Sequence, residues 1–162
     1  MIFGVVLPNF VGLGHREPMV RIAQTAEELG FASLWTSDQV LMPAALFDPY
    51  GDNLECLTTL AFLACCTHRI RLGTSILILP LRDRVIVAKQ VATIHELSGG
   101  RFTLGVGVGW SEAEFQCLGV DFDTRSQLTD QHLDVIRTLW GSRRTGRSRC
   151  HGRNPLARGP RR

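Results

Sequence analysis

The fold is decided by residues 70–108, which read IRLGTSIL at 70–77, VAKQVATI at 87–94 and RFTLGVGV at 101–108. The first and last of these runs are short and mostly apolar, as in strands that are buried on both faces. The middle run places Val87, Val91 and Ile94 three and four residues apart, which gives one apolar stripe along a helix. Gly99 and Gly100 follow, where a helix can end in a residue with positive φ. The stretch therefore predicts a strand, a helix and a second strand.

The same alternation extends toward the N-terminus. Two further strand-type runs lie at residues 2–7 and 32–36, so that the four runs begin about 30 to 38 residues apart. Helical apolar stripes lie between them at residues 19–29 and 57–64, and a last one lies at residues 128–139. Alternating strands and helices predict an α/β fold with a parallel sheet covered by helices. Two architectures fit this pattern, an open doubly wound sheet and a piece of a (β/α)₈ barrel.

The composition is that of one globular domain. The chain has 162 residues, of which 44% are apolar and 20% charged. No apolar run approaches the roughly 18 residues of a membrane span, and the first residues lack the pattern of a signal peptide. We therefore expect a cytoplasmic protein without membrane association. The five cysteines include no Cys-x-x-Cys pair, which favours buried free thiols over disulfides or a zinc site.

Residues 142–162 differ in charge from the rest of the chain. They contain eight arginines and no acidic residue, whereas residues 1–141 contain all 15 acidic residues. Leu156 is the only large aliphatic residue of this segment, so burial cannot offset the entropy cost of ordering it. We expect a disordered tail. Its charge would suit phosphate contacts, but without stacking aromatic residues or a recognition motif a nucleic-acid partner is not favoured.

In a barrel, the chemistry gathers on the loops that follow the carboxyl ends of the strands. Asp38 lies in such a loop, where it could cap a backbone turn or hold the polar edge of a ligand. Gly105, Gly107 and Gly109 are spaced G-x-G-x-G, which disfavours a dinucleotide fingerprint and favours close backbone packing with room for a flat ligand.

The remaining chemistry-bearing residues form no recognisable catalytic pattern. The five histidines share no common spacing, so we interpret them as solvated or core residues. No nucleophile elbow, metal-binding histidine pair or P-loop is present, so no residue pattern supports a hydrolase or kinase function. We predict no metal site.

Four runs, in order, resemble one known family: WTSD at 35–38, LTTLA at 57–61, THRIRLGT at 67–74 and AKQVATIHELSGGRFTLGVGVGW at 88–110. The chain resembles the bacterial luciferase-like monooxygenases, and within them the branch of oxidoreductases that use coenzyme F-420, a deazaflavin. The segment Ser98–Arg101 is the most specific element of this likeness.

The resemblance implies a (β/α)₈ TIM barrel, of which residues 1–141 would form the first four units and residues 142–162 a tail that is disordered or out of frame. It also implies a coenzyme F-420 or FMN ring over the barrel mouth. By position, Asp38 would contact the polar edge of the ring. Ser75 and Ile76 would form a cis peptide bulge behind it, and Gly107 and Gly109 would leave room for it.

Two residues and the length depart from the family pattern. Gln39 stands where many members have a histidine, and Gln cannot exchange a proton near neutral pH. Trp110 stands where sugar-phosphate dehydrogenases of the family have a glutamate. A complete barrel takes about 250 residues, and the likeness ends near Gly141. We therefore expect truncation, without the second-half loops that hold the cofactor phosphate in relatives.

Two functions follow as expectations. The first is a flavin- or deazaflavin-dependent oxidoreductase or monooxygenase that acts on a small-molecule substrate by hydride transfer or oxygen activation, with no catalytic residue assigned. The alternative is a non-catalytic half-barrel that acts only through association with another chain. In both cases the exposed sheet edges predict a homo-oligomer.

Overall fold

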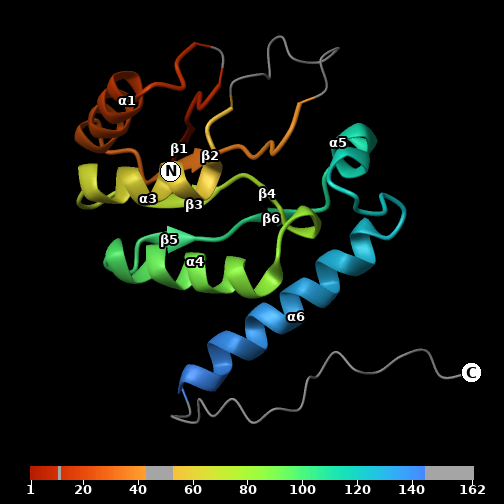
Figure 1. The fold of residues 1–162 in the computed structure, drawn as a ribbon. Coiled ribbons are helices and arrows are strands. Elements are labelled where there is room, and N and C mark those ends of the chain that lie inside the picture. The colour runs from red at the N-terminus through yellow and green to blue at the C-terminus, as the bar shows by residue number, and fades with distance from the viewer. Residues whose placement is uncertain (11, 43–52, 145–162) are drawn as a thin grey trace, which may run out of the picture.

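The computed structural model describes residues 1–10, 12–42 and 53–144. In this part, strands and helices alternate along the chain (Figure 1). The strands are β1 (Gly4–Val6), β2 (Ser33–Thr36), β3 (Arg71–Thr74), β4 (Leu77–Ile78), β5 (Phe102–Thr103) and β6 (Val106–Gly107). The helices are α1 (Arg16–Glu28), α3 (Cys56–Cys66), the 3₁₀ turn η2 (Leu79–Leu81), α4 (Arg84–Leu97), α5 (Glu112–Cys117) and α6 (Arg125–Arg144).

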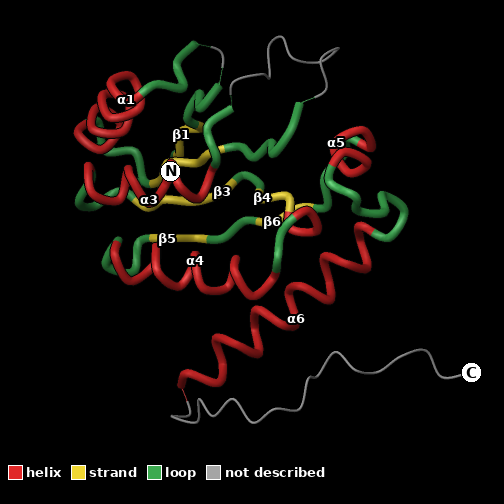
Figure 2. Tube along the Cα trace, viewed as in Figure 1, coloured by secondary structure: helices red, strands yellow, loops and turns green. Residues whose placement is uncertain are grey.

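All described strand pairs are parallel. Strands β1, β2, β3 and β5 form one sheet in that order, and β4 pairs with β6 (Figures 1 and 2). The register aligns Val6 with Trp35 and Trp35 with Gly73. The prediction of four parallel strand runs in chain order is confirmed.

The third and fourth predicted strands are each interrupted. Residues 75–76 separate β3 from β4, and residues 104–105 separate β5 from β6. At this point the Thr74 hydroxyl donates to the Gly105 carbonyl at 2.7 Å, and the Gly105 N–H donates to the Thr74 hydroxyl oxygen at 3.0 Å. A side chain thus takes the place of a backbone partner in the ladder, which divides two continuous apolar runs into four short strands.

The helices cover one face of the sheet. Leu34 and Leu72 are fully buried on that face, in a core shared with Ala23 of α1, Leu60 of α3 and Val91 of α4. The opposite face presents residues that alternate with these along the strands. This one-sided cover is the arrangement of a barrel wall, whereas a doubly wound sheet carries helices on both faces.

The uncovered face carries an indole ring over two glycines. Trp35 donates its Nε1–H to the Ser33 hydroxyl at 2.8 Å. A Cβ at Gly73 would lie 2.6 Å from Trp35 Cε3, and one at Gly4 would lie 2.8 Å from Trp35 Nε1. Both positions therefore exclude a side chain while the ring lies there. Val6, opposite Trp35 in the register, is 60% exposed.

The helix boundaries follow the predicted signals, except at the C-terminus. Gly30 adopts φ 80° just after α1, and Gly99 and Gly100 adopt φ 66° and 83° after α4. Helix α6 continues to Arg144, three residues beyond the predicted boundary at Gly141. The remaining tail, residues 145–162, lies outside the described residues, so its disorder stays a prediction.

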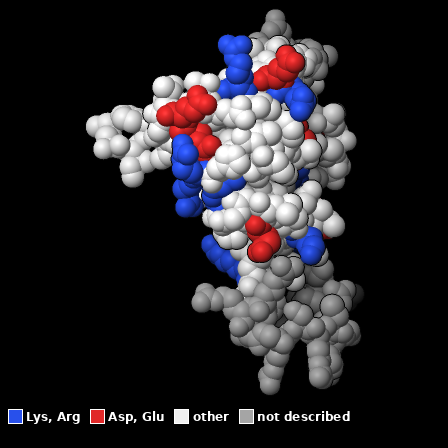
Figure 3. Space-filling model, turned by 90° about the vertical axis from the view of Figure 1, so that its left-hand side faces the viewer, with Lys and Arg blue, Asp and Glu red and all other residues white. Residues whose placement is uncertain are grey.

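Two surface observations bear on partners. On the face shown in Figure 3, acidic and basic side chains are interspersed rather than gathered by sign. Among the described helices, none combines the length and apolar character that a membrane span requires.

Candidate functional site

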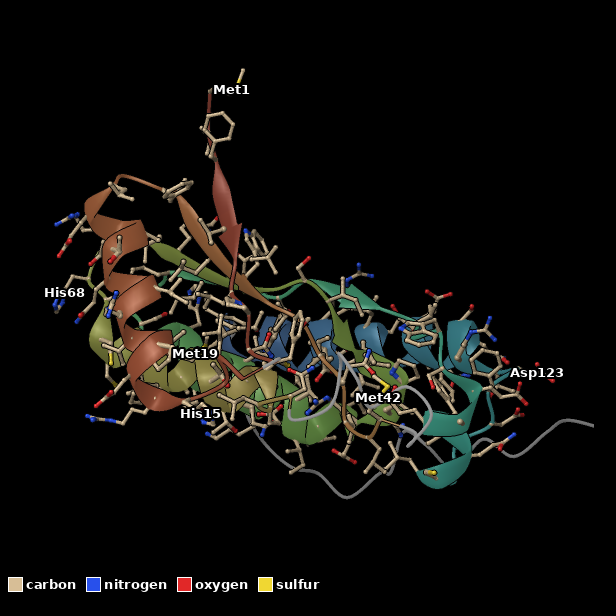
Figure 4. The ribbon with its side chains drawn as sticks, turned by 90° about the horizontal axis from the view of Figure 1, so that it is seen from above. Met1, His15, Met19, Met42, His68 and Asp123 are labelled. Atoms are coloured by element: carbon tan, nitrogen blue, oxygen red, sulfur yellow. The ribbon has the colours of Figure 1, made fainter. Side chains whose placement is uncertain are left out.

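The predicted site residues lie at the carboxyl ends of the strands: Asp38 after β2, Ser75 and Ile76 after β3, Gly107 at the end of β6 and Gly109 after it. Met42 ends the described part of the segment that follows β2. Viewed from above, it lies toward the end of the molecule that carries Asp123 and away from His68 at the opposite end (Figure 4). His68 lies three residues before the start of β3 and so marks the amino-terminal ends of the strands.

Asp38 is buried, and protein groups bind both of its carboxylate oxygens. Its side chain is 0% exposed, and Oδ1 accepts from Arg82 Nη2 at 2.6 Å. Oδ2 accepts from the Ile78 N–H at 2.9 Å and from Arg82 Nε at 3.3 Å. Of the two interpretations left open by the sequence, this geometry favours the structural one, because the carboxylate caps a backbone N–H of β4 and forms a bidentate ion pair.

Arg82 links Asp38 to the start of helix α3. Its Nη1 donates to Glu55 Oε1 at 2.9 Å, and Glu55 accepts the Thr58 N–H at the helix N-terminus. Burial lowers the pKa of Arg82, but the Asp38 charge and hydrogen bonds outweigh it, so the pKa is raised overall. Burial raises the pKa of Glu55, but the bonds from Thr58 and the Arg82 charge leave it below its usual value.

Cys56 completes a group of three possible metal ligands. The ligand atoms of Asp38, Glu55 and Cys56 lie within 4.8 Å of one another. Burial, and then the Asp38 charge, raise the pKa of the Cys56 thiol far above its usual value, so it is protonated. Arg82 pairs with both carboxylates of the group. The Arg82 guanidinium therefore supplies the positive charge that balances the two carboxylates, and we assign no metal to this group.

The Ser75–Ile76 peptide bond is cis, as the resemblance implied. The Ser75 N–H donates to the Thr36 carbonyl at 2.8 Å, and the Ile76 side chain is 38% exposed. A Cβ at Gly107 would lie 2.7 Å from Ile76 Cδ1. The space beside Gly107 therefore admits the Ile76 side chain.

Gly109, two residues further along and just after β6, has a similar packing role. It adopts φ 79°, and a Cβ there would lie 2.8 Å from both Ile78 Cγ2 and Phe115 Cε2. The two glycines thus let β6 approach β4 closely, as the packing interpretation of the sequence expected. All five predicted residues come together around β4, since Asp38 binds the N–H of Ile78 and the glycines face Ile76 and Ile78.

Three buried polar atoms near these strand ends have no hydrogen-bond partner among the described residues: Thr36 Oγ1, Gln39 Oε1 and Glu114 Oε2. Thr36 ends β2, Gln39 follows Asp38, and Glu114 lies on α5. Most buried polar atoms are paired in folded proteins, so these three atoms are exceptions to that rule.

Sequence reasoning missed several polar residues that build this region. Asn9 is 0% exposed; its Nδ2 donates to the Ser37 and Leu54 carbonyls, and its Oδ1 accepts from Ser37. It joins the loops after β1 and β2. Arg82 and Glu114 were missed as well, because their partners are 27 to 74 residues away in the sequence. For Glu114, the pattern S-x-x-E at 111–114 is a signal that could have found the helix.

His132 contacts η2, the turn that follows β4. It is buried, and its Nδ1 lies 3.2 Å from the Leu79 carbonyl of η2. This agrees with its interpretation as a core histidine.

Comparisons with known proteins identify the family. The chain matches the luciferase-like monooxygenases over residues 1–162. It is 33% identical over 138 residues to the pyrimidine monooxygenase RutA of Bradyrhizobium sp. (strain BTAi1), an alignment that covers 82% of this chain and 37% of RutA. The chain thus spans well under half the length of this relative.

Two solved structures share the fold. The monooxygenase RslO1 from Streptomyces bottropensis aligns with a TM-score of 0.74 and 25% identity, over 86% of this chain and 43% of RslO1. The coenzyme F420-dependent tetrahydromethanopterin reductase from Methanopyrus kandleri aligns with a TM-score of 0.58 and 28% identity, over 75% of this chain and 30% of the reductase. Because the family match covers its whole length, the chain belongs to the luciferase-like monooxygenase family.

Proposed function

We propose that this chain forms one wall of a flavin- or deazaflavin-binding site in an oxidoreductase, at the carboxyl ends of its strands. The observation that carries the proposal is the meeting of the predicted ring residues around β4, with Ile76 partly exposed beside Gly107. These residues lie at the carboxyl ends of the strands, where family resemblance expects the ring. FMN and coenzyme F-420 are the two candidate cofactors.

The residues present fit such a ring in chemistry. A flavin or deazaflavin ring has an N–H donor and carbonyl acceptors along its polar edge. The Gln39 amide can both donate and accept hydrogen bonds along such an edge. Asp38 contributes indirectly in this proposal, because its carboxylate already binds Arg82 and the Ile78 N–H.

Each of the five predicted residues has its own role in this proposal. Ser75 and the partly exposed Ile76 side chain contact the apolar face of the ring. Gly107 and Gly109 place Ile76 and Ile78, and Asp38 fixes the backbone at Ile78.

The cofactor supplies the redox chemistry when bound, by hydride transfer or oxygen activation. The residues of this chain orient it and exclude water from one face. Gln39 hydrogen-bonds but does not move a proton near neutral pH. The relatives named above are named as monooxygenases or as an F420-dependent reductase. Their names support the proposal that this chain belongs to an enzyme with a small-molecule substrate.

Titration of the full chain with FMN and, separately, coenzyme F-420 tests the proposal by fluorescence. Gly107→Ala places a Cβ against Ile76 and should weaken binding about tenfold, which corresponds to about 1.4 kcal/mol. Gly141→Ala is the matched control, because a Cβ there meets nothing within 4 Å. Absence of binding to both cofactors, or equal affinity of both variants, would overturn the proposal.

A second function has one specific observation in its favour. Met1, Ile2, Phe3 and Val6 are 58 to 105% exposed on and before β1, which lies at the edge of the described sheet. Exposed apolar edge strands favour association, since burial of apolar area contributes roughly 25 cal/mol per Å². We therefore also propose a homo-oligomer, either as the form of the enzyme or as the whole role of a non-catalytic chain.

Light scattering measures this association directly. A dimer or larger assembly is expected, and Val6→Lys should shift it toward the monomer because it places a charge on the edge strand. A wild-type chain that stays monomeric at high concentration contradicts the association.

A further inference from the structure

Glu114 makes a contact that its place in the sequence does not predict. It lies on the short helix α5, is 1% exposed, and accepts two backbone N–H groups on one oxygen. Oε1 accepts from the Val40 N–H at 2.6 Å and from the Leu41 N–H at 3.1 Å. These two bonds, here called the Glu114 clasp, join the segment after β2 to the segment after β6.

The Glu114 carboxylate does not make the bond to its own helix that a capping box would predict. Ser111 accepts the Glu114 N–H at 3.4 Å, which is one half of a capping box. In the other half, the glutamate side chain would bind the N–H of the capping residue. Here that side chain instead binds Val40 and Leu41, so the contact serves the loop rather than the helix.

The held segment is the one that carries the candidate site. Asp38 and Gln39 directly precede Val40, and Asp38 is itself anchored to Ile78 and Arg82. Val40 and Leu41 are 39% and 45% exposed, so packing holds these residues weakly. The clasp is therefore the main described contact that fixes the backbone immediately after Gln39.

We propose that Glu114 is a positioning residue for the cofactor site: through Val40 and Leu41 it fixes the course of residues 38–41, and so the place of Gln39. The proposal rests on the proposed function above. It assigns no contact between Glu114 and the substrate.

The clasp does not depend on the charge of the carboxyl group. Burial raises the pKa of Glu114, opposed by the N–H groups of Leu41 and Val40, while Asp38 raises it further and Arg82 lowers it. Both N–H groups bind Oε1, so a proton on the carboxyl group would reside on Oε2 and leave the clasp intact. A glutamine at this position, with a carbonyl oxygen in the place of Oε1, should therefore preserve it.

Three variants of the full chain test the proposal. Glu114→Leu removes the acceptor, Glu114→Gln keeps it, and Glu112→Leu is the control on the same helix, since Glu112 is exposed and its carboxylate accepts a bond from the Gln116 side chain. The rate of hydrogen–deuterium exchange at the Val40 and Leu41 amides reports whether the clasp is formed, and this measurement needs no cofactor. Titration with FMN and coenzyme F-420 reads the site.

Glu114→Leu should speed exchange at these two amides about tenfold and weaken cofactor binding by about the same factor. Glu114→Gln and Glu112→Leu should match the wild type in both measurements. If Glu114→Leu does not fold, Glu114→Ala replaces it in both measurements.

Unchanged exchange at both amides overturns the clasp. Faster exchange with unchanged affinity overturns the positioning role, as does failure of Glu114→Gln to restore affinity. If the wild type binds neither cofactor, the proposed function fails and the positioning role with it, while the exchange data still report whether the clasp exists.

Discussion

Arg101 should contribute more to stability than any exposed arginine of this chain, and replacing it by lysine tests this. Its guanidinium donates five hydrogen bonds of 2.7 to 3.0 Å, to the Ser98, Ala64, Thr67 and Ile70 carbonyls and to the Thr67 hydroxyl. These acceptors lie at the ends of α3 and α4 and at the start of β3. One side chain therefore connects the C-terminal ends of α3 and α4 to the start of β3.

Lysine cannot reproduce this arrangement. Its three donors sit on one atom, whereas the acceptors of Arg101 are distributed around a planar fork. Two or more carbonyls would lose their partner, at about 1.5 to 3 kcal/mol for each bond from a charged donor, and the losses are not additive. We expect Arg101→Lys to lower the free energy of unfolding by about 3 to 5 kcal/mol, a large share of the roughly 5 to 15 kcal/mol of a typical domain.

Thermal unfolding followed by circular dichroism measures the effect. At about 2 to 4 °C per kcal/mol for a chain of this length, the Tm should fall by about 6 to 20 °C. Arg137→Lys is the control, because Arg137 is 71% exposed and has one ion pair of 3.8 Å; its change should stay below about 0.5 kcal/mol. A Tm shift of Arg101→Lys no larger than that of the control would refute the reasoning.

Three other substitutions have defined outcomes. Asp38→Asn leaves the Arg82 guanidinium, 15% exposed, without its bidentate partner, and urea unfolding should show a loss of about 3 kcal/mol; a neutral result would mean that Glu55 alone suffices. Glu27 accepts the N–H groups of residues 68–70; burial raises its pKa, but these bonds outweigh it and leave the pKa lowered. The ionised form therefore stabilises the fold above the unfolded-state pKa, and this contribution is lost as the pH falls through the folded pKa. Glu27→Gln should cost about 1 kcal/mol at pH 7 and progressively less below about pH 4.3, so a pH-independent difference in urea midpoints contradicts it. Gly105→Ala places a Cβ against the Thr74 carbonyl and should destabilise by about 1 to 3 kcal/mol, whereas Gly141→Ala should not; equal midpoints would exclude the clash.

The strands and long helices could be predicted because each carries a periodic pattern of its own. Val87, Val91 and Ile94 are all buried on α4, and Leu34 and Leu72 are buried on their strands. The breaks inside the third and fourth strand runs could not, because they arise where Thr74 bonds to Gly105 across 31 residues. The short helix α5 has too few residues to show a period.

The candidate site was only partly predictable for a related reason. Asp38 is recognisable as a polar residue at a strand end, but its partner Arg82 lies 44 residues away and its choice depends on the fold. Arg101 illustrates the reverse case. Its segment carries the most specific likeness to the family, yet its bonds all go to the protein's own backbone and to Thr67. A distinctive motif can thus maintain a fold rather than a reaction.

The placement of the tryptophans gives this chain three separate optical reporters. The chain has three of them, and each lies in a different setting. Trp35 covers glycines on the uncovered face of the sheet, Trp110 is 58% exposed after β6, and Trp140 donates to the Ala88 carbonyl between α6 and α4. Emission from a variant that retains only Trp35 would shift to shorter wavelength when another chain covers that face. Emission from a variant that retains only Trp110 would be quenched by energy transfer to a flavin at the strand ends, so association and cofactor binding can each be followed in a separate variant.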